Sequence, residues 1–382
     1  MAFDFDTPVE RRHSDSVKWG RYQGRDILPL WVADSDFRSP PAVLEALARR
    51  VEHGVFGYGV PGPGLVAAVV ETCAREWGWA VEPHWLVWLP GLVSGLNVTC
   101  RAVGEPGDGV ACFTPIYPPF LKSPALQGRE LLTIPLSGDN VAGWGLDRGR
   151  LERSLGQGAR LLLWCHPHNP VGRVWRRDEL ELVAEACLAR RTVICSDEIH
   201  NQLVLEPGAR HLPLALLGPE VAARTITLLA PSKAFNVAGL GCALAVIPDD
   251  DLRRRFKRAM AGIVPEVNVM GFVAAEAAWT AGADWLAAQN AYLLRNRGLL
   301  EREITALPGV TMPRVEATYL AWLDVRALGL ADPAAHFETH GLGLSDGREF
   351  AGQGYLRLNF ACPRTTLEEA CVRLRRAVAA TG

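Results

Sequence analysis

Lys233 is the residue of this sequence best suited to covalent chemistry. It lies in the short polar segment APSKAFN (230–236), directly after the apolar run 225–229. Burial would lower the pKa of this lysine, because a charged ammonium loses its hydration there, and a neutral amine is the nucleophile that forms an imine with a carbonyl compound. The alternative is a solvated surface lysine, the usual setting of this residue type, and the local sequence favours neither.

Asp197 follows another apolar run and would need a positively charged partner. It stands in the segment SDEIH (196–200), after the apolar residues 193–195, so we expect its side chain to be largely buried. A buried carboxylate without a partner is costly. A protonated pyridine nitrogen could supply the positive charge, and an Asp in that position would keep such a ring an electron sink. An ordinary salt bridge or a helix cap are the alternatives.

Two further polar side chains lie in these segments. Asn169, in HPHNPVG (166–172), could donate a hydrogen bond to an oxygen on the ring, although an Asn before Pro more often initiates a turn. His200 lies three residues beyond Asp197 and could meet the same oxygen, or it could be a buried core histidine. The spacing from Asp197 is the reason to include His200.

A phosphate group would need backbone N–H groups at the start of a helix. The segment LPGLVSG (89–95) leads from an expected strand into an expected helix, which puts Gly91, Leu92 and Val93 at the first turn. Ser232 could add a hydroxyl group. A plain connection between a strand and a helix would look the same, so this pattern is a weak signal.

A tyrosine and an arginine complete the set. Tyr117, at the expected start of the helix after the strand 109–113, could stack on a flat ring or pack in the core. Arg357 lies in the segment YLRLNF (355–360), between apolar residues of an expected strand. A buried guanidinium requires a carboxylate, which is either an internal Asp or Glu or the α-carboxylate of a substrate. The sequence leaves both readings open.

The elements that carry these residues alternate between short apolar runs and helical patterns, which predicts parallel strand–helix–strand units from about residue 85 to 250. The expected strands are 85–89, 109–113, 130–135, 160–165, 192–196, 225–229 and 242–247. Residues 177–190 show apolar positions at helical spacing. Because ligands bind at the carboxyl ends of such strands, the polar segments that follow three of them should line one site.

Beyond about residue 275 the pattern changes to long helical stretches such as 283–303, followed by short strands at 319–325 and 354–360. We therefore expect an α/β protein with two domains. The larger domain, residues 50–278, would hold a mainly parallel seven-stranded sheet flanked by helices. Residues 1–49 and 279–382 would form a smaller α+β domain, and the two would frame a cleft.

Composition excludes several classes of partner. The 382 residues are 49% hydrophobic and 21% charged, which is typical of a globular protein with a large core. Lys and Arg number 40 against 42 Asp and Glu, so the formal charge of -2 provides no field for nucleic acid or an anionic membrane. No apolar run approaches the length of a membrane span. A small-molecule ligand is the better expectation.

Two features indicate the compartment. The nine cysteines are scattered through hydrophobic stretches without C-x-x-C spacing or histidine partners, so we expect reduced core residues and no metal site. Residues 1–13 open with acidic residues and lack an apolar core, which predicts neither a signal peptide nor a transit peptide. We therefore expect a cytoplasmic protein.

Four motifs, in this order and spacing, resemble those of the fold-type I pyridoxal phosphate (PLP) enzymes of the aminotransferase class I/II superfamily: HNPVG, SDEIH, SKAFN and YLRLN. The cystathionine β-lyase type of bacterial carbon-sulfur lyase is similar in further segments, namely RRHSDSVKW, DILPLWVADSDF, FGYGVPGP, HPHNPVGRVW and RLNFACPR. The likeness covers nearly the whole chain. It implies a PLP cofactor and the fold-type I architecture.

The resemblance also implies roles for the cofactor-binding residues. Lys233 would form the Schiff base with PLP, and Asp197 would pair with the pyridine nitrogen. Asn169 and His200 would lie beside the phenolic oxygen, and Tyr117 would stack on the ring.

The same resemblance implies how the substrate is bound. Arg357 would hold the α-carboxylate of an amino acid, and Asn169, Tyr117 and Ala33 would contact the substrate, since the segment 31–36 is expected close to it. Members of this family are homodimers that complete each other's sites. Tyr58 would therefore reach the phosphate of the partner subunit's cofactor and belong to that catalytic site.

The implied activity is cleavage of the Cβ–S bond of L-cystathionine or another L-cysteine S-conjugate by α,β-elimination, which gives a thiol, pyruvate and ammonia. Gly241 stands where many aminotransferases carry an Arg, which favours a lyase, whereas Ser35 replaces a Met that is common in such lyases. The alternatives are an aminotransferase, an enzyme of natural-product biosynthesis that decarboxylates or oxidatively deaminates an S-conjugated cysteine, and a protein whose main role is to bind a regulatory partner.

Overall fold

A seven-stranded sheet forms the centre of the larger part of the protein. The computed structural model describes residues 3–381, and within them the strand order is β2-β8-β7-β6-β5-β3-β4. The strands are β2 (Leu86–Leu89), β3 (Gly109–Thr114), β4 (Glu130–Pro135), β5 (Ala159–Cys165), β6 (Val193–Asp197), β7 (Thr225–Leu229) and β8 (Ala243–Val246). Strand β8 runs antiparallel to both neighbours and the remaining pairs are parallel. The predicted mainly parallel sheet is therefore confirmed.

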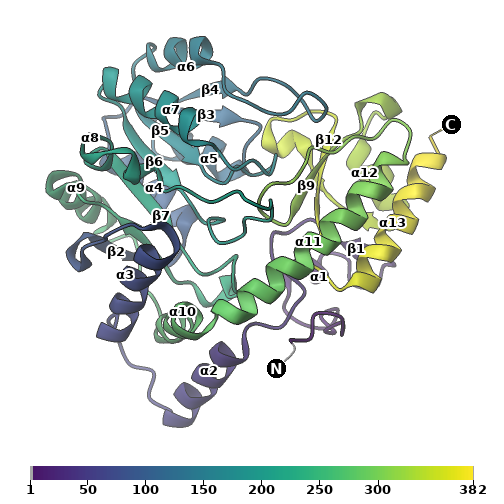
Figure 1. The fold of residues 1–382 in the computed structure, drawn as a ribbon, viewed down its shortest axis with the longest axis horizontal. Helices are drawn as coiled ribbons and strands as arrows, with labels where there is room; N and C mark the ends of the chain where they lie inside the picture. The colour runs from purple at the N-terminus through teal and green to yellow at the C-terminus, as the bar shows by residue number, and fades with distance from the viewer. Residues whose placement is uncertain (1–2, 382) are drawn as a thin grey trace.

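Helices cover both faces of this sheet, so its inner strands are largely apolar (Figure 1). On β5, Leu161 and Leu163 pack with the helices α4 and α9 on one face. Leu162 and Trp164 pack on the other face with α6 and α7. The bounds of these helices are α4 (Leu92–Ala102), α9 (Asp250–Met260), α6 (Arg148–Leu155) and α7 (Arg177–Ala189).

The C-terminal part forms a second, smaller sheet. Its antiparallel strands, in the order β11-β12-β9, are β11 (Ser345–Asp346), β12 (Tyr355–Asn359) and β9 (Leu320–Asp324). The helices beside it are α11 (Ala283–Thr305), α12 (Pro333–Thr339) and α13 (Arg364–Ala379). The N-terminal segment joins this part, because β1 (Leu28–Pro29) pairs in parallel with β10 (Leu342–Gly343). Figure 1 shows the purple N-terminal chain beside the yellow C-terminal elements.

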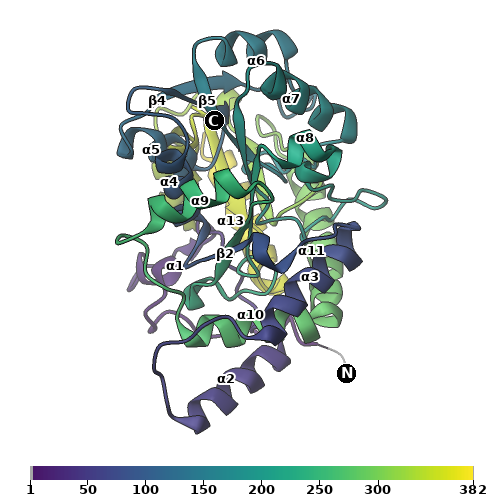
Figure 2. The same ribbon diagram turned by 90° about the vertical axis from the view of Figure 1, so that its left-hand side faces the viewer.

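Three helices lie on the side of the molecule away from the small sheet. They are α2 (Pro41–His53), α3 (Pro63–Trp77) and α10 (Val269–Ala281). The chain that links α2 to α3 runs out from the body of the protein (Figure 2). Among the described helices, none combines the length and the apolar character that crossing a membrane requires.

The sheet topology brings the predicted site segments to one edge. Strands β3, β5, β6 and β7 are mutually parallel neighbours, so the loops that follow them leave the same edge. Strand β2 has the same direction, because both β2 and β7 are antiparallel to β8. The turn into α4 and the start of the helix α5 (Pro118–Leu126) therefore meet the segments 166–172, 196–200 and 230–236.

Candidate active site

A cavity of about 340 Å³ opens at this edge of the sheet. It lies between the large sheet and the small one, with the N-terminal segment as a third wall. Every predicted site residue except Tyr58 lines it, namely Ala33, Gly91, Leu92, Val93, Tyr117, Asn169, Asp197, His200, Ser232, Lys233 and Arg357. The structure thus gathers residues from seven separate stretches of sequence at one place.

Lys233 is held in the cavity wall rather than in solvent. Its Nζ donates a hydrogen bond to the carbonyl oxygen of Ala33 at 2.7 Å. Burial lowers the pKa of the amine to about 8, while the nearby carboxylates of Asp34 and Asp197 oppose this shift and Arg357 adds to it. A pKa near 8 leaves a usable fraction of neutral amine close to neutral pH, as imine formation requires.

Asp197, at the end of β6, is a buried carboxylate that faces the same cavity. Its Oδ1 accepts a hydrogen bond from the N–H of Ile199 at 3.1 Å. Burial raises the pKa of Asp197 to about 7, and Lys233 lowers it by less than burial raises it. A cationic group bound in the cavity would remove this penalty, so the carboxylate fits a protonated ring nitrogen.

Arg357 has neutral acceptors rather than a carboxylate partner. Its Nη1 donates to Asn169 Oδ1 at 3.1 Å, and its Nη2 donates to the carbonyl oxygen of Trp31 at 2.9 Å and to Ser345 Oγ at 3.3 Å. The guanidinium stacks over the Phe350 ring at 4.5 Å, and its buried Nε has no hydrogen-bond partner among residues 3–381. Burial lowers the pKa of Arg357 to about 10. A guanidinium in this setting is well suited to bind the carboxylate of a ligand.

His200 is buried and lines the cavity with an unpaired ring nitrogen. Its Nδ1 has no hydrogen-bond partner in the described part of the chain, and burial lowers the pKa of the ring to about 3, so the ring is neutral. Tyr117 precedes the first residue of α5 and places its ring in the cavity wall, where burial raises the pKa of the hydroxyl. A neutral polar ring and a flat aromatic ring are groups that fit an aromatic cofactor.

The start of α4 offers a place for an anion. Gly91 caps this helix without a side-chain hydrogen bond, so the N–H groups of its first turn are free of a capping side chain. Gly91, Leu92, Val93 and Ser232 all line the cavity. Free amides and the positive end of the helix dipole together favour a phosphate. The four residues fit the phosphate of PLP.

The sequence matches the family aminotransferase class I and II over residues 25–374. The chain belongs to this family.

Known proteins and solved structures are similar to this chain over nearly its full length. Cystathionine beta-lyase PatB of Bacillus subtilis is 36% identical, with 98% of this chain and 100% of the relative covered. The structure of OvoB has 48% identity and a TM-score of 0.96, covering 99% of this chain and 100% of that one. Cystalysin from Treponema denticola, whose structure contains PLP, has 30% identity and a TM-score of 0.95 with both chains fully covered.

Tyr58 lies away from the cavity of its own chain. It is fully exposed in the segment between α2 and α3, in a surface hollow formed by residues 56–60 and 265–270. Its expected contact with the cofactor of a second subunit therefore stays a prediction.

The sequence did not predict Tyr319 as a residue near the site. Tyr319 is buried and donates a hydrogen bond from its hydroxyl to the carbonyl oxygen of Ala33 at 3.0 Å. It follows no turn or motif, so no pattern marks it. Of the segment 31–36, Trp31, Val32 and Ala33 line the cavity, so the expected closeness of the whole segment to the substrate stays a prediction.

Proposed function

We propose that this protein is a PLP-dependent carbon-sulfur lyase that cleaves the Cβ–S bond of L-cystathionine or another L-cysteine S-conjugate. The observation that carries the proposal is one cavity that holds a buried amine, a buried carboxylate and a buried guanidinium without a carboxylate partner, provided by Lys233, Asp197 and Arg357. Similarity to a cystathionine beta-lyase over nearly the whole chain supports this choice within the family.

The residues of the cavity would hold PLP in a defined way. Lys233 would carry it, Asp197 would keep its ring nitrogen protonated, and Asn169 and His200 would lie beside its phenolic oxygen. Tyr117 would stack on the ring. The backbone amides of residues 91–93 and the hydroxyl of Ser232 would hold the phosphate of PLP. Bound PLP supplies an electron sink that stabilises negative charge at the α-carbon of an amino acid.

The chain's own residues account for the rest of the reaction. Arg357 would bind the α-carboxylate and fix the orientation of the α-carbon. Lys233, with a pKa of about 8, would take the α-proton, since a base is most effective when its pKa is close to the working pH. The sulfur would then leave as a thiolate with the electrons of the Cβ–S bond. Hydrolysis of the remaining three-carbon fragment gives pyruvate and ammonia.

Product analysis tests this proposal. L-cystathionine and other cysteine S-conjugates are incubated with the PLP-loaded enzyme without a keto acid, and pyruvate, ammonia and thiol are expected in equal amounts. Amino transfer that depends on an added keto acid would instead indicate an aminotransferase, and carbon dioxide release would indicate a decarboxylating enzyme. Lys233→Ala should abolish turnover and the visible absorption of the bound cofactor. Lys257→Ala, at an exposed position of α9, is the matched control.

We also propose that the protein is a homodimer with shared sites. The exposed apolar residues of the segment between α2 and α3, Val55, Phe56, Tyr58 and Val60, are suited to contact a second copy. Tyr58 would then reach the phosphate of the partner's cofactor. Mixing Lys233→Ala subunits with Tyr58→Phe subunits should restore roughly a quarter of the wild-type sites, because each mixed dimer has one intact site. Activity equal to the mean of the two parents would count against shared sites.

We also propose the domain boundaries and the compartment. Residues 50–278 would form the larger domain, and 1–49 with 279–382 the smaller one. Among the described residues, all nine cysteines are buried and free of disulfides, which supports a reducing compartment such as the cytoplasm.

A further inference from the structure

Several side chains hold the backbone of residues 31–37 through hydrogen bonds. Each carbonyl from Trp31 to Ser35 accepts at least one hydrogen bond from a side chain. Asn359, on β12, donates to the carbonyls of Val32 and Asp34 at 2.6 Å each. This 31–37 segment is irregular, so side chains supply the partners that a strand or helix would find in the backbone.

Both cationic residues of the proposed active site are among the donors. The Lys233 amine and the Tyr319 hydroxyl share the carbonyl of Ala33, at 2.7 and 3.0 Å. The Arg357 guanidinium donates to the carbonyl of Trp31 at 2.9 Å. The position of the 31–37 segment therefore sets where the amine and the guanidinium lie relative to each other.

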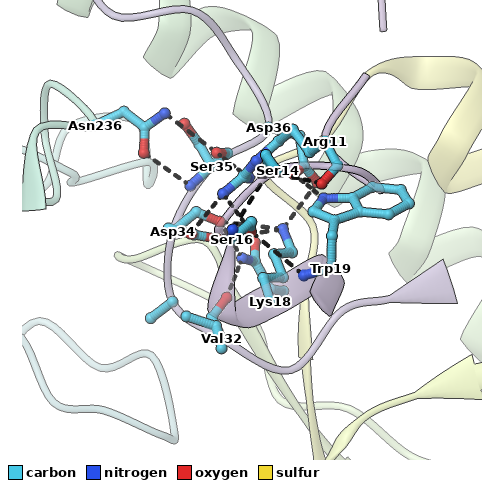
Figure 3. A network of polar contacts seen from close by, with 12 residues as sticks. Arg11, Ser14, Ser16, Lys18, Trp19, Val32, Asp34, Ser35, Asp36 and Asn236 are labelled. Carbon is cyan, nitrogen blue, oxygen red and sulfur yellow. Dashed lines mark hydrogen bonds and ion pairs between the residues drawn. The ribbon is translucent and has the colours of Figure 1, made fainter. Parts of the chain in front are cut away.

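A cluster of four charged side chains fixes the far side of this segment (Figure 3). Lys18 is fully buried and pairs with Asp36 at 2.8 Å and with Asp34 at 3.6 Å. Arg11 pairs with the same two carboxylates, at 2.9 Å to Asp34 and 2.6 Å to Asp36. Two positive and two negative charges balance, and none of the four side chains lines the cavity.

A second tie connects the segment to the loop of the lysine. Asn236 lies three residues after Lys233 and adopts a left-handed backbone conformation with φ of 54°. Its Nδ2 donates to the carbonyls of Ser35 and Phe37 at 3.1 and 2.8 Å, and its Oδ1 accepts from the N–H of Ser35 at 3.2 Å. Figure 3 shows this amide meeting the segment from the side opposite Lys18 and Arg11.

Burying a lysine costs several kcal/mol, and a buried ion pair stabilises a fold no better than apolar packing of the same volume in many proteins. Ion pairs depend on direction, so they place a neighbouring segment better than apolar packing does. We propose that Lys18 is a positioning residue for catalysis: together with Arg11 it holds Asp34 and Asp36 so that the carbonyls of Ala33 and Trp31 stay aimed at the Lys233 amine and the Arg357 guanidinium. This inference rests on the proposed roles of those two cations.

The variant Lys18→Met tests the inference, with Lys257→Met as the matched control. The first measurement follows the visible absorption as PLP is added to protein from which it has been removed, which reports the reactivity of the Lys233 amine without any turnover. We expect uptake to slow at least tenfold in Lys18→Met and to be unchanged in the control. The second measurement is kcat and KM of the loaded enzyme with a cysteine S-conjugate, where we expect KM to rise and kcat to fall, each about tenfold.

The double variant Lys18→Met/Asp36→Asn separates positioning from charge balance, because it removes one charge of each sign. If the inference is right, the double variant recovers its melting temperature, but its uptake of PLP stays slow and its kcat/KM stays low. Uptake and turnover that return to wild-type values with stability, or a Lys18→Met protein that loses only melting temperature, would overturn it. If the wild-type protein shows no lyase turnover, the proposed function is contradicted. If Lys18→Met still slows PLP uptake in that case, the positioning role remains supported.

Discussion

Replacing Asp197 by Asn should make the cofactor-free protein more stable and the loaded enzyme nearly inactive. Burial raises the pKa of this carboxyl from its ordinary value of 3.8 to about 7, so the folded protein holds the ionised form at a cost. A shift of about 3 pKa units corresponds to about 4 kcal/mol. Asn keeps an oxygen for the N–H of Ile199 and carries no charge.

The pH dependence gives this prediction its sign. Because the pKa of Asp197 is raised on folding, its contribution to stability is fully present below about pH 4 and is lost as the pH rises through 7. The gain from Asp197→Asn should therefore be about 2 kcal/mol at pH 5 and about 4 kcal/mol at pH 8. Glu198 titrates in the same range, and its negative charge also raises the pKa of Asp197, so Asp197→Asn relieves that repulsion as well.

Urea unfolding of the two cofactor-free proteins at pH 5, 6.5 and 8 measures this difference. With PLP bound the order should reverse, because the wild-type carboxylate then has a cationic partner, and kcat of the variant should fall by several orders of magnitude. A stability difference that does not change between pH 5 and 8 would refute the reasoning. So would an Asp197→Asn enzyme that binds PLP and turns over normally.

Two more predictions follow from buried charges. Arg357→Gln should raise KM for a cysteine S-conjugate roughly a hundredfold with a smaller change in kcat, since charge-assisted hydrogen bonds contribute about 1.5 to 3 kcal/mol each; steady-state kinetics would test this, and an unchanged KM would place the carboxylate elsewhere. Glu198→Ala should lower the free energy of unfolding by about 3 kcal/mol, because Glu198 accepts hydrogen bonds from His211 at 2.7 Å, from Ser196 at 2.7 Å and from the N–H of Leu214 at 3.2 Å. Urea unfolding would measure the loss, and stability within error of the wild type would mean that water replaces these bonds.

The sequence predicted the large sheet closely because most of its strands are buried on both faces. Strands β4 and β7 have the predicted bounds, 130–135 and 225–229. Strands β2, β3 and β5 differ by one residue at one end, and β6 and β8 differ by one residue at each end. Continuous apolar runs between turn residues carry that signal. The start of β2 is one of the differences, because residues 83–85 form a short 3-10 helix before it.

The candidate site was predictable where a polar residue interrupts, ends or closely follows an apolar strand. Arg357 interrupts β12, Asp197 ends β6 and Lys233 follows β7, and all three line the cavity. Contacts made by the main chain could not be predicted in this way. The carbonyl of Ala33 accepts from Lys233 across 200 positions of sequence, and no residue type marks a carbonyl as an acceptor.

The pairing of β1 with β10 also bears on how the protein is made. A strand near the start of the sequence finds its only ladder partner, among the described residues, close to the end, and the cavity takes walls from both. The lysine loop leaves the ribosome well before the strand that bears Arg357. The cavity is therefore completed only after β12 has been synthesised, so a newly made chain must avoid aggregation until then before it can retain a coenzyme.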